Sequence, residues 1–169
     1  SRIFNTLKKR YKVTLFPLDY KKVEIKSVDQ LTHKYYRAAC HNQNKPILNT
    51  ITEYESLEIL KTLIASYMSR YPKIKQINEN NLEFIKKEIF WIQNCNYLSE
   101  SEYQVADRSG LSDSDSDGPQ KLAKNSEVRK VLFKIQNDYL KEVKALNKIT
   151  FEAFRIRGLM EIKNSPGEK

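Results

Sequence analysis

The side chains in this sequence that could ligate a metal or act as a nucleophile are two histidines and two cysteines. His33, Cys40 and His41 lie in the first third of the chain, and Cys95 follows much later. Zinc sites use paired Cys or His ligands at short, regular spacings, and no such arrangement is present here. A Cys–His nucleophile would also need oxyanion donors, and no glycine stands near these residues to provide a backbone amide. We therefore expect two surface histidines and two reduced core thiols, with no metal and no cofactor.

Motifs that position catalytic groups or cradle a cofactor are absent as well. The sequence holds no GxxxxGKS/T phosphate loop, no GxGxxG fingerprint, no HExxH metal pair and no GxSxG nucleophile turn. It also lacks the signatures of RNA-recognition, KH, homeodomain, bromodomain and coiled-coil families. We therefore expect a chain that is not an enzyme and that works by binding.

Charge is a stronger signal, because the formal net charge of +9 is concentrated in two blocks. Residues 1–26 carry eight basic and two acidic side chains, and residues 121–148 carry eight basic and three acidic ones. Residues 27–107 between them are close to neutral, with nine basic and ten acidic side chains. Blocks of this kind favour contacts with phosphates, since neutralising phosphates releases counterions.

Eight residues of the two blocks are the candidate nucleic-acid contacts: Lys8, Lys9, Arg10, Lys12, Arg129, Lys130, Lys134 and Lys141. The last four lie on a predicted helix, where Lys130, Lys134 and Lys141 fall near one side because steps of four and seven residues return to nearly the same face, with Arg129 beside them. An ordinary solvated helix face is the alternative, because three acidic residues on that helix partly compensate the lysines. The stretch 34–37, KYYR, interleaves cations with tyrosines on which single strands stack. Tyr35 falls on an apolar helix stripe, however, which favours a core position.

A run of alternating serine and aspartate precedes the second basic block. Ser112 and Ser114 each have an acidic residue three positions later, the pattern that acidophilic kinases of the casein-kinase-2 type prefer. Each phosphate would add a charge of about −1.5 to −2. A phosphorylated loop would then compete with an acidic ligand for the basic edge of the following helix. The alternative is a solvated insertion without a regulatory role.

Most of the chain has the periodicity of helices. Residues 27–30, 52–55 and 99–102 have the form of a capping box, and residues 80–83 mark a further helix start. Apolar residues then recur at spacings of three and four, most regularly in the late part of the chain: Val128, Leu132, Ile135, Tyr139, Val143 and Leu146. A last short helix begins at Phe151, capped by Thr150 or ending near Gly158.

The remaining segments predict one hairpin and one loop. Residues 11–26 alternate apolar and polar side chains, which predicts an N-terminal β-hairpin. Residues 108–124 contain two Gly, one Pro and four Ser without any aromatic residue, which indicates a flexible acidic loop. We predict a mainly α fold: a single compact domain over residues 1–169, with about five helices and the small hairpin, and an α+β fold as the alternative.

These features lead to two hypotheses about function. The first is a protein-interaction (scaffold or adaptor) domain of a larger intracellular complex, in the nucleus or else the cytoplasm. A complex associated with chromatin would fit this hypothesis. The alternative is a basic domain that contacts phosphates of DNA or RNA and is regulated by the phosphorylatable loop. The longest apolar runs are a few residues, so no membrane partner is expected. The chain begins at Ser1 without a methionine, which suggests a piece of a longer protein.

Overall fold

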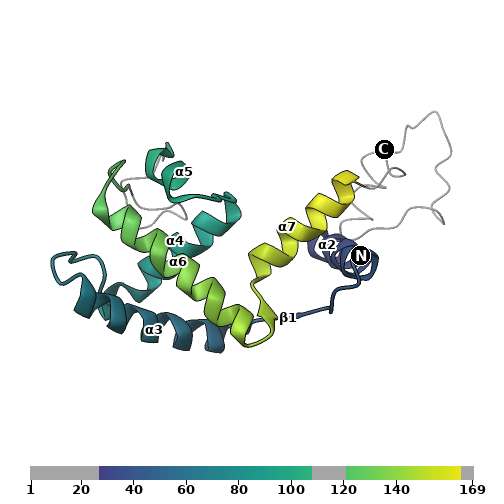
Figure 1. The fold of residues 1–169 in the computed structure, drawn as a ribbon, viewed down its shortest axis with the longest axis horizontal. Helices are drawn as coiled ribbons and strands as arrows, with labels where there is room; N and C mark the ends of the chain where they lie inside the picture. The colour runs from purple at the N-terminus through teal and green to yellow at the C-terminus, as the bar shows by residue number, and fades with distance from the viewer. Residues whose placement is uncertain (1–26, 108–120, 165–169) are drawn as a thin grey trace, which may run out of the picture.

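The computed structural model describes residues 27–107 and 121–164 of the 169-residue chain (Figure 1). The elements follow in this order: α2 (Val28–Asn42), β1 (Asn49–Thr50), α3 (Glu53–Arg70), the 3₁₀ turn η2 (Glu79–Asn81), α4 (Leu82–Asn94), α5 (Glu100–Val105), α6 (Glu127–Ala145), β2 (Lys148–Ile149) and α7 (Phe151–Asn164). The predicted mainly α fold is confirmed. The hairpin predicted at residues 11–26 lies outside the described residues, as does most of the Ser-Asp loop.

Three helices begin at the capping boxes that the sequence predicts. Ser27, Thr52 and Ser99 each accept a hydrogen bond from the backbone N–H three residues later, and the side chain at that position returns the bond. The start of α4 differs from the prediction, because Asn81 makes no side-chain cap bond. Asn78 instead caps the η2 turn that leads into this helix.

Asparagine ends three of the helices. Asn44, Asn96 and Asn147 have φ angles of 50°, 53° and 54°, in the left-handed region. After α2 the N–H of Asn44 donates to the carbonyl of His41 at 3.1 Å, and the N–H of Lys45 donates to that of Cys40 at 2.8 Å, which is a Schellman motif. Glycine is the usual residue at this position and asparagine is tolerated there. A sequence with four glycines therefore uses asparagine to stop its helices.

The larger hydrophobic cluster is built by α3, α4, α5 and α6. On α6 the side chains of Leu132, Ile135, Tyr139 and Val143 are buried, as the periodicity predicts. Polar bonds between buried or half-buried groups also join α3 to α6. The hydroxyls of Ser56 and Tyr139 lie 2.7 Å apart, and the Tyr67 hydroxyl donates to Asp138 at 2.8 Å.

The smaller cluster lies where α7 crosses α2 (Figure 1). Tyr36, Cys40, Ile149 and Phe154 form it. At the crossing, a Cβ on Gly158 would lie 2.5 Å from the carbonyl oxygen of Thr32. The prediction that the last helix could end near Gly158 is therefore wrong: α7 continues to Asn164, and the glycine serves a close contact between helices.

Two short parallel strands lie between the two groups of helices (Figure 1). Asn49 pairs with Lys148 and Thr50 with Ile149, and the N–H of Ile51 donates to the carbonyl of Ile149 at 2.9 Å. The sequence did not predict these strands, because two residues are too few to show an alternating pattern. They fix where the chain leaves α2 and enters α7.

Candidate functional site

The predicted phosphate contact Arg129 is a buried structural residue. Its side chain is 1% exposed. The guanidinium donates to four backbone carbonyls at 2.7–3.0 Å, those of Tyr103, Gln104, Ala106 and Leu122. The prediction of a surface contact is therefore wrong for this residue. Arg129 instead caps the C-terminal end of α5 and joins the two chain segments on either side of residues 108–120.

Two residues at the end of the predicted flexible loop, Leu122 and Lys124, contact the rest of the fold, whereas Lys121 and Ala123 are exposed. The side chain of Leu122 packs against the larger hydrophobic cluster. Lys124 forms an ion pair with Asp107, across the gap between the two segments. The boundary predicted at residue 124 therefore lies too far along the chain.

The other basic residues predicted on α6 have partners within the chain or lie at its surface. Lys130 and Lys134 are half-buried and Lys141 is exposed. Lys134 donates to the Tyr71 hydroxyl at 3.2 Å, a bond that raises the pKa of this lysine. Lys141 pairs with Asp138 at 2.8 Å. The further candidates lie outside the described residues: Lys8, Lys9, Arg10, Lys12, Ser112 and Ser114.

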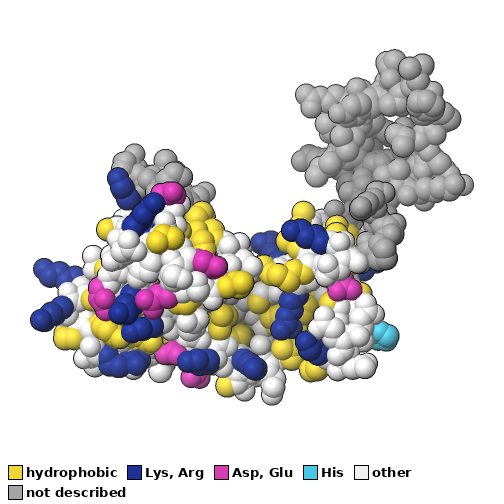
Figure 2. All heavy atoms as spheres, turned by 45° about the horizontal axis from the view of Figure 1, so that its top comes forward, with side chains coloured by type: hydrophobic (Ala, Val, Ile, Leu, Met, Phe, Trp, Pro, Cys, Tyr) yellow, Lys and Arg dark blue, Asp and Glu magenta, His cyan; other side chains and the backbone are white. Residues whose placement is uncertain are grey.

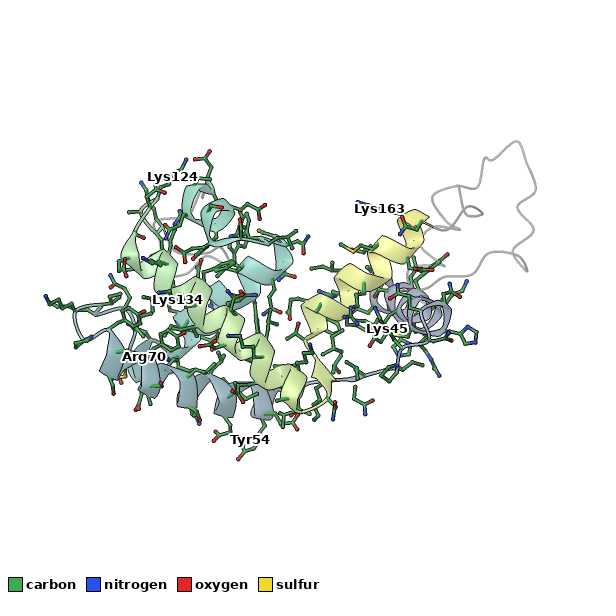
Figure 3. All side chains as sticks on the ribbon, viewed as in Figure 1. Lys45, Tyr54, Arg70, Lys124, Lys134 and Lys163 are labelled. Carbon is green, nitrogen blue, oxygen red and sulfur yellow. The ribbon has the colours of Figure 1, made fainter. Side chains whose placement is uncertain are left out.

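Sequence reasoning missed a basic and aromatic patch at the end of α3. The Arg70 guanidinium lies 4.0 Å from the centre of the Tyr67 ring, and the Tyr67 and Tyr71 rings stack at 5.9 Å. Lys134 of α6 lies 5.6 Å from the Tyr71 ring. Figure 3 shows Arg70 and Lys134 in the group formed by α3 and α6, whereas Lys45 and Lys163 lie in the α2–α7 group. We call the four residues the Arg70–Lys134 patch.

The surface around this patch is basic. Lys73 and Lys75 follow it in the exposed loop after α3, and Figure 2 shows Lys and Arg side chains gathered at that end of the molecule. The sequence feature that could have predicted this patch is the stretch RYPKIK at residues 70–75, which directly follows the apolar stripe of α3. The KYYR stretch at 34–37, by contrast, gives no stacking platform, because Tyr35 and Tyr36 are 6% and 1% exposed.

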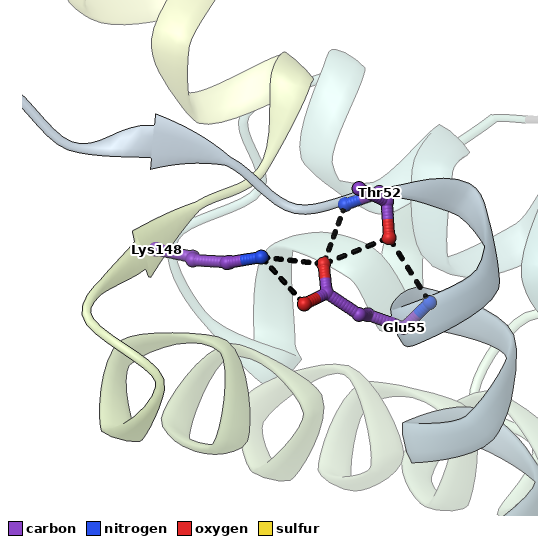
Figure 4. Close-up of polar contacts among 3 residues, drawn as sticks. All are labelled: Thr52, Glu55 and Lys148. Carbon is purple, nitrogen blue, oxygen red and sulfur yellow. Dashed lines mark hydrogen bonds and ion pairs between the residues drawn. The ribbon is translucent and has the colours of Figure 1, made fainter.

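Glu55 fixes the strand pair to the start of α3 (Figure 4). Its carboxylate accepts hydrogen bonds from the Lys148 ammonium at 2.5 and 2.6 Å, and from the N–H and hydroxyl of Thr52 at 3.0 and 2.8 Å. These bonds, the one from Lys148 above all, lower the pKa of Glu55 from its ordinary 4.5 to about 2. The carboxylate is therefore ionised at neutral pH and holds β2 beside the chain that follows β1.

A groove of about 500 Å³ runs along β1, between α2 and the first turn of α7. Its apolar walls come from Tyr36, Ile47, Leu48, Phe151 and Phe154. Ile47 is 50% exposed and Phe151 is 40% exposed, so apolar surface remains open to solvent here. We call this feature the β1 groove.

The rim of the β1 groove is polar. Asp29 accepts two hydrogen bonds from the Arg155 guanidinium, at 2.8 and 3.0 Å, and His33 stands beside Phe154 with ring centres 5.6 Å apart. The rim therefore carries a neutralised ion pair and an imidazole. Apolar surface, and not charge, dominates the groove.

The strand that borders this groove has one hydrogen-bonded neighbour among the described residues. Successive amide groups of an extended strand point to opposite sides. Because the N–H of Ile51 donates to Ile149 of β2, the N–H of Thr50 points away from β2. Thr50 also lines the groove. The groove therefore combines an apolar floor with an open strand edge.

Several other residues that the sequence singled out lie apart from one another. His33 and His41 are exposed, Cys40 is buried and Cys95 is exposed, so the expectation of two core thiols is wrong for Cys95. Within residues 27–107 and 121–164, no three His, Cys, Asp or Glu side chains are grouped to hold a metal ion. In the same residues we find no helix with the length and apolar character needed to cross a bilayer.

Comparison with known proteins gives no relative from which to read a function. No protein-family model, curated protein or solved structure matches the chain. The surfaces described above therefore carry the functional argument.

Proposed function

We propose that this chain is a non-enzymatic protein-interaction domain whose β1 groove binds an extended, apolar segment of a partner protein. The observation that carries the proposal is the open edge of β1 beside a groove of about 500 Å³ with apolar walls. Extended peptides add to open strand edges through main-chain hydrogen bonds, and adjoining pockets take alternate side chains. Buried aromatic and aliphatic contacts of this kind supply much of the binding energy at interfaces.

The test is a selection of extended peptides from a displayed library, followed by affinity measurements on variants of the groove. Thr50→Pro removes the N–H that would pair with an added strand, and proline is tolerated at strand edges. Ile47→Ser removes apolar surface from the wall. Each should weaken binding at least tenfold, while Tyr54→Ser, at a 73% exposed position outside the groove, should leave it unchanged.

Two results would overturn the proposal. One is a selection that yields no specific binder. The other is a binder whose affinity is the same for Thr50→Pro, Ile47→Ser and the wild-type chain, since such a peptide binds elsewhere. A melting curve for each variant establishes that the groove residues are changed within a folded chain.

A second candidate function is nucleic-acid binding at the Arg70–Lys134 patch. The observation that favours it is the contact of Lys134 with the half-buried Tyr71 ring, next to exposed Arg70, Lys73 and Lys75. Tyr67 is 3% exposed, so its ring is not available to a base. Cations beside aromatic rings are the groups that bind phosphates and stack on bases of single strands. The burial of Arg129 removes one of the predicted phosphate contacts on α6, so the patch would act mainly through the end of α3.

Titration of single-stranded and duplex DNA at two salt concentrations tests this candidate. Binding should weaken as salt rises, and Lys73→Ala with Lys75→Ala should reduce the salt slope by about one per lost contact. Lys45→Ala with Lys163→Ala, both in the α2–α7 group, is the charge-matched control. Absence of measurable binding at low salt would eliminate this function and leave the β1 groove as the proposed site.

A further inference from the structure

A second cavity lies on the other side of α7, between this helix, α4 and α6. Its volume is about 220 Å³, and its walls include Ile92, Phe133, Leu140 and Ile156. Leu98, 77% exposed, also lines it and connects it to the surface. The α7 residues that line this cavity and those that line the β1 groove fall on nearly opposite faces of the helix. The cavity is therefore a separate site, and the inference below does not rest on the proposed function.

Two buried glutamines line this apolar cavity. Gln93 of α4 is 7% exposed and Gln136 of α6 is 5% exposed. The Thr150 hydroxyl donates to Gln93 Oε1 at 2.7 Å, which orients this amide. Among the described residues, however, Gln93 Nε2 and Gln136 Oε1 have no hydrogen-bond partner. One cavity is thus lined by a residue with an unused donor and a residue with an unused acceptor.

Unused buried polar atoms are uncommon and costly. A buried polar group that is left unpaired has lost its bonds to water without replacement, and folded proteins hold few such groups. Two of opposite kind beside one cavity fit a ligand group that offers an acceptor and a donor together. A secondary amide does so, because its C=O accepts and its N–H donates.

We propose that this cavity binds a peptide group of a partner protein together with one apolar side chain. The peptide C=O accepts from Gln93 Nε2, and the peptide N–H donates to Gln136 Oε1. The adjoining side chain packs against Phe133, Leu140 and Ile156. Both glutamine atoms are sealed from solvent in the free chain. The ligand reaches Gln136 Oε1 when the terminal amide of Gln136 turns about its broad final torsion, while the bond from Thr150 keeps the Gln93 amide in place.

The size of the cavity supports a single residue as the occupant. One water takes about 30 Å³, so a cavity of about 220 Å³ has the volume of roughly seven waters. Most drug-sized ligands need about 300 Å³ or more. The walls also include the polar side chains of Asn96, Tyr97 and Asn137 beside the apolar ones, so water is the competing occupant that the experiment must exclude.

The experiment uses two small probes that differ in one atom. N-isobutylacetamide carries one secondary amide, and isobutyl acetate has the same shape with an oxygen in place of the N–H. Both are titrated into the full chain, with the side-chain amide signals of Gln93 and Gln136 and the methyl signals of Leu140 followed by NMR. We expect the amide to bind at least tenfold more tightly than the ester and to shift all three sets of signals.

Variants then assign the contact to the glutamines. Gln136→Met keeps the size of the side chain and removes its acceptor, so it should abolish the preference for the amide. Gln76→Met, at an exposed position outside the cavity, should retain it. If Gln136→Met fails to fold, the comparison of amide and ester in the wild-type chain still decides.

The remaining outcomes each overturn the proposal. Equal affinity for the amide and the ester would mean that the cavity binds apolar groups and does not recognise the amide N–H. Binding of neither probe would mean a cavity that holds water only. Uracil presents N–H and C=O groups side by side, whereas they point in opposite directions in a trans amide. It serves as a third probe, and tighter binding of uracil than of the amide would replace the peptide with a nucleobase.

Discussion

Arg129 illustrates how one residue from a basic block can serve the fold instead of a ligand. A guanidinium has five N–H donors in a planar fork, which lets it bond several acceptors at once. Here it donates to carbonyls at the end of α5 and to the carbonyl of Leu122. Its positive charge also lies at the C-terminal end of α5, where the helix dipole is negative. Its position three residues before Leu132 and ten before Tyr139 places it on the buried face of α6, which distinguishes it from Lys130.

Removing the Arg129 guanidinium should therefore destabilise the chain. A hydrogen bond to a charged group contributes about 1.5–3 kcal/mol, so Arg129→Met should lower the free energy of unfolding by about 3 kcal/mol or more. Arg129→Lys should retain only part of the stability that the guanidinium provides, because an ammonium cannot reach the same set of carbonyls. Urea unfolding measures the effect, with Lys130→Met as the control. Similar losses in Arg129→Met and Lys130→Met would contradict the structural role.

The Glu55 carboxylate should make stability depend on pH in acid. Its pKa in the folded chain is about 2, below the ordinary 4.5, so its contribution is fully present above about pH 4.5. That contribution is lost as the pH falls through the folded value. Glu55→Gln should therefore flatten the fall in urea midpoint between pH 5 and pH 2. Glu58→Gln on the same helix is the control, and an unchanged pH profile in Glu55→Gln would count against the bonds of Figure 4.

At the scale of elements, the two segments on either side of residues 108–120 are held together by bonds between them. Arg129 bonds both sides, Lys124 pairs with Asp107, and the N–H of Asn125 donates to the carbonyl of Gln104 at 3.1 Å. The structural anchor is therefore residues 121–125 together with the end of α5.

Two loop replacements distinguish the anchor from the Ser-Asp residues. Replacing residues 108–120 with a short Gly-Ser linker should preserve the melting temperature better than replacing residues 108–124, which also removes Leu122 and Lys124. In a chain of this size, 1 kcal/mol shifts the melting temperature by about 2–4 °C. The longer replacement should therefore melt several degrees lower, as followed by circular dichroism. Equal melting temperatures would show that residues 121–124 contribute nothing.

The distance along the chain between contacting residues explains which elements the sequence predicts. The capping boxes and the apolar stripe of α6 follow from residues three or four positions apart, so local spacing was sufficient. The role of Gly158 depends on Thr32, and β1 depends on β2, in each case about a hundred residues away or more. The β1 groove and the cavity between α4, α6 and α7 also arise from contacts between distant segments, whereas the bonds of Arg129 reach 7 to 26 residues along the chain. They could not be predicted without the fold.

At the scale of the whole molecule, the two hydrophobic clusters are linked by polar contacts as well as by packing. Thr150, just before α7, donates to Gln93 of α4, and its hydroxyl oxygen also accepts from the N–H of Ala153. Lys148 of β2 pairs with Glu55 of α3. Both links involve half-buried or buried groups, whose loss is costly. We therefore expect the two clusters to unfold together.

Gly158→Ala tests this coupling, because the change lies in the smaller cluster alone. The added Cβ would lie 2.5 Å from a backbone oxygen, which cannot rotate away as a flexible side chain can. Overpacking costs about 1–3 kcal/mol, while alanine regains up to about 1 kcal/mol of helix propensity. The single tryptophan, Trp91, lies on α4 and reports on the unfolding of this helix of the larger group, whereas circular dichroism reports on all helices. If the clusters are coupled, Gly158→Ala lowers both melting curves by the same amount, because the larger cluster cannot remain folded without the smaller one.

A tryptophan transition that stays in place while the dichroism transition splits would show two independently folding units. The β1 groove, whose walls come from α2 and α7, would then open well below the temperature at which the larger cluster melts.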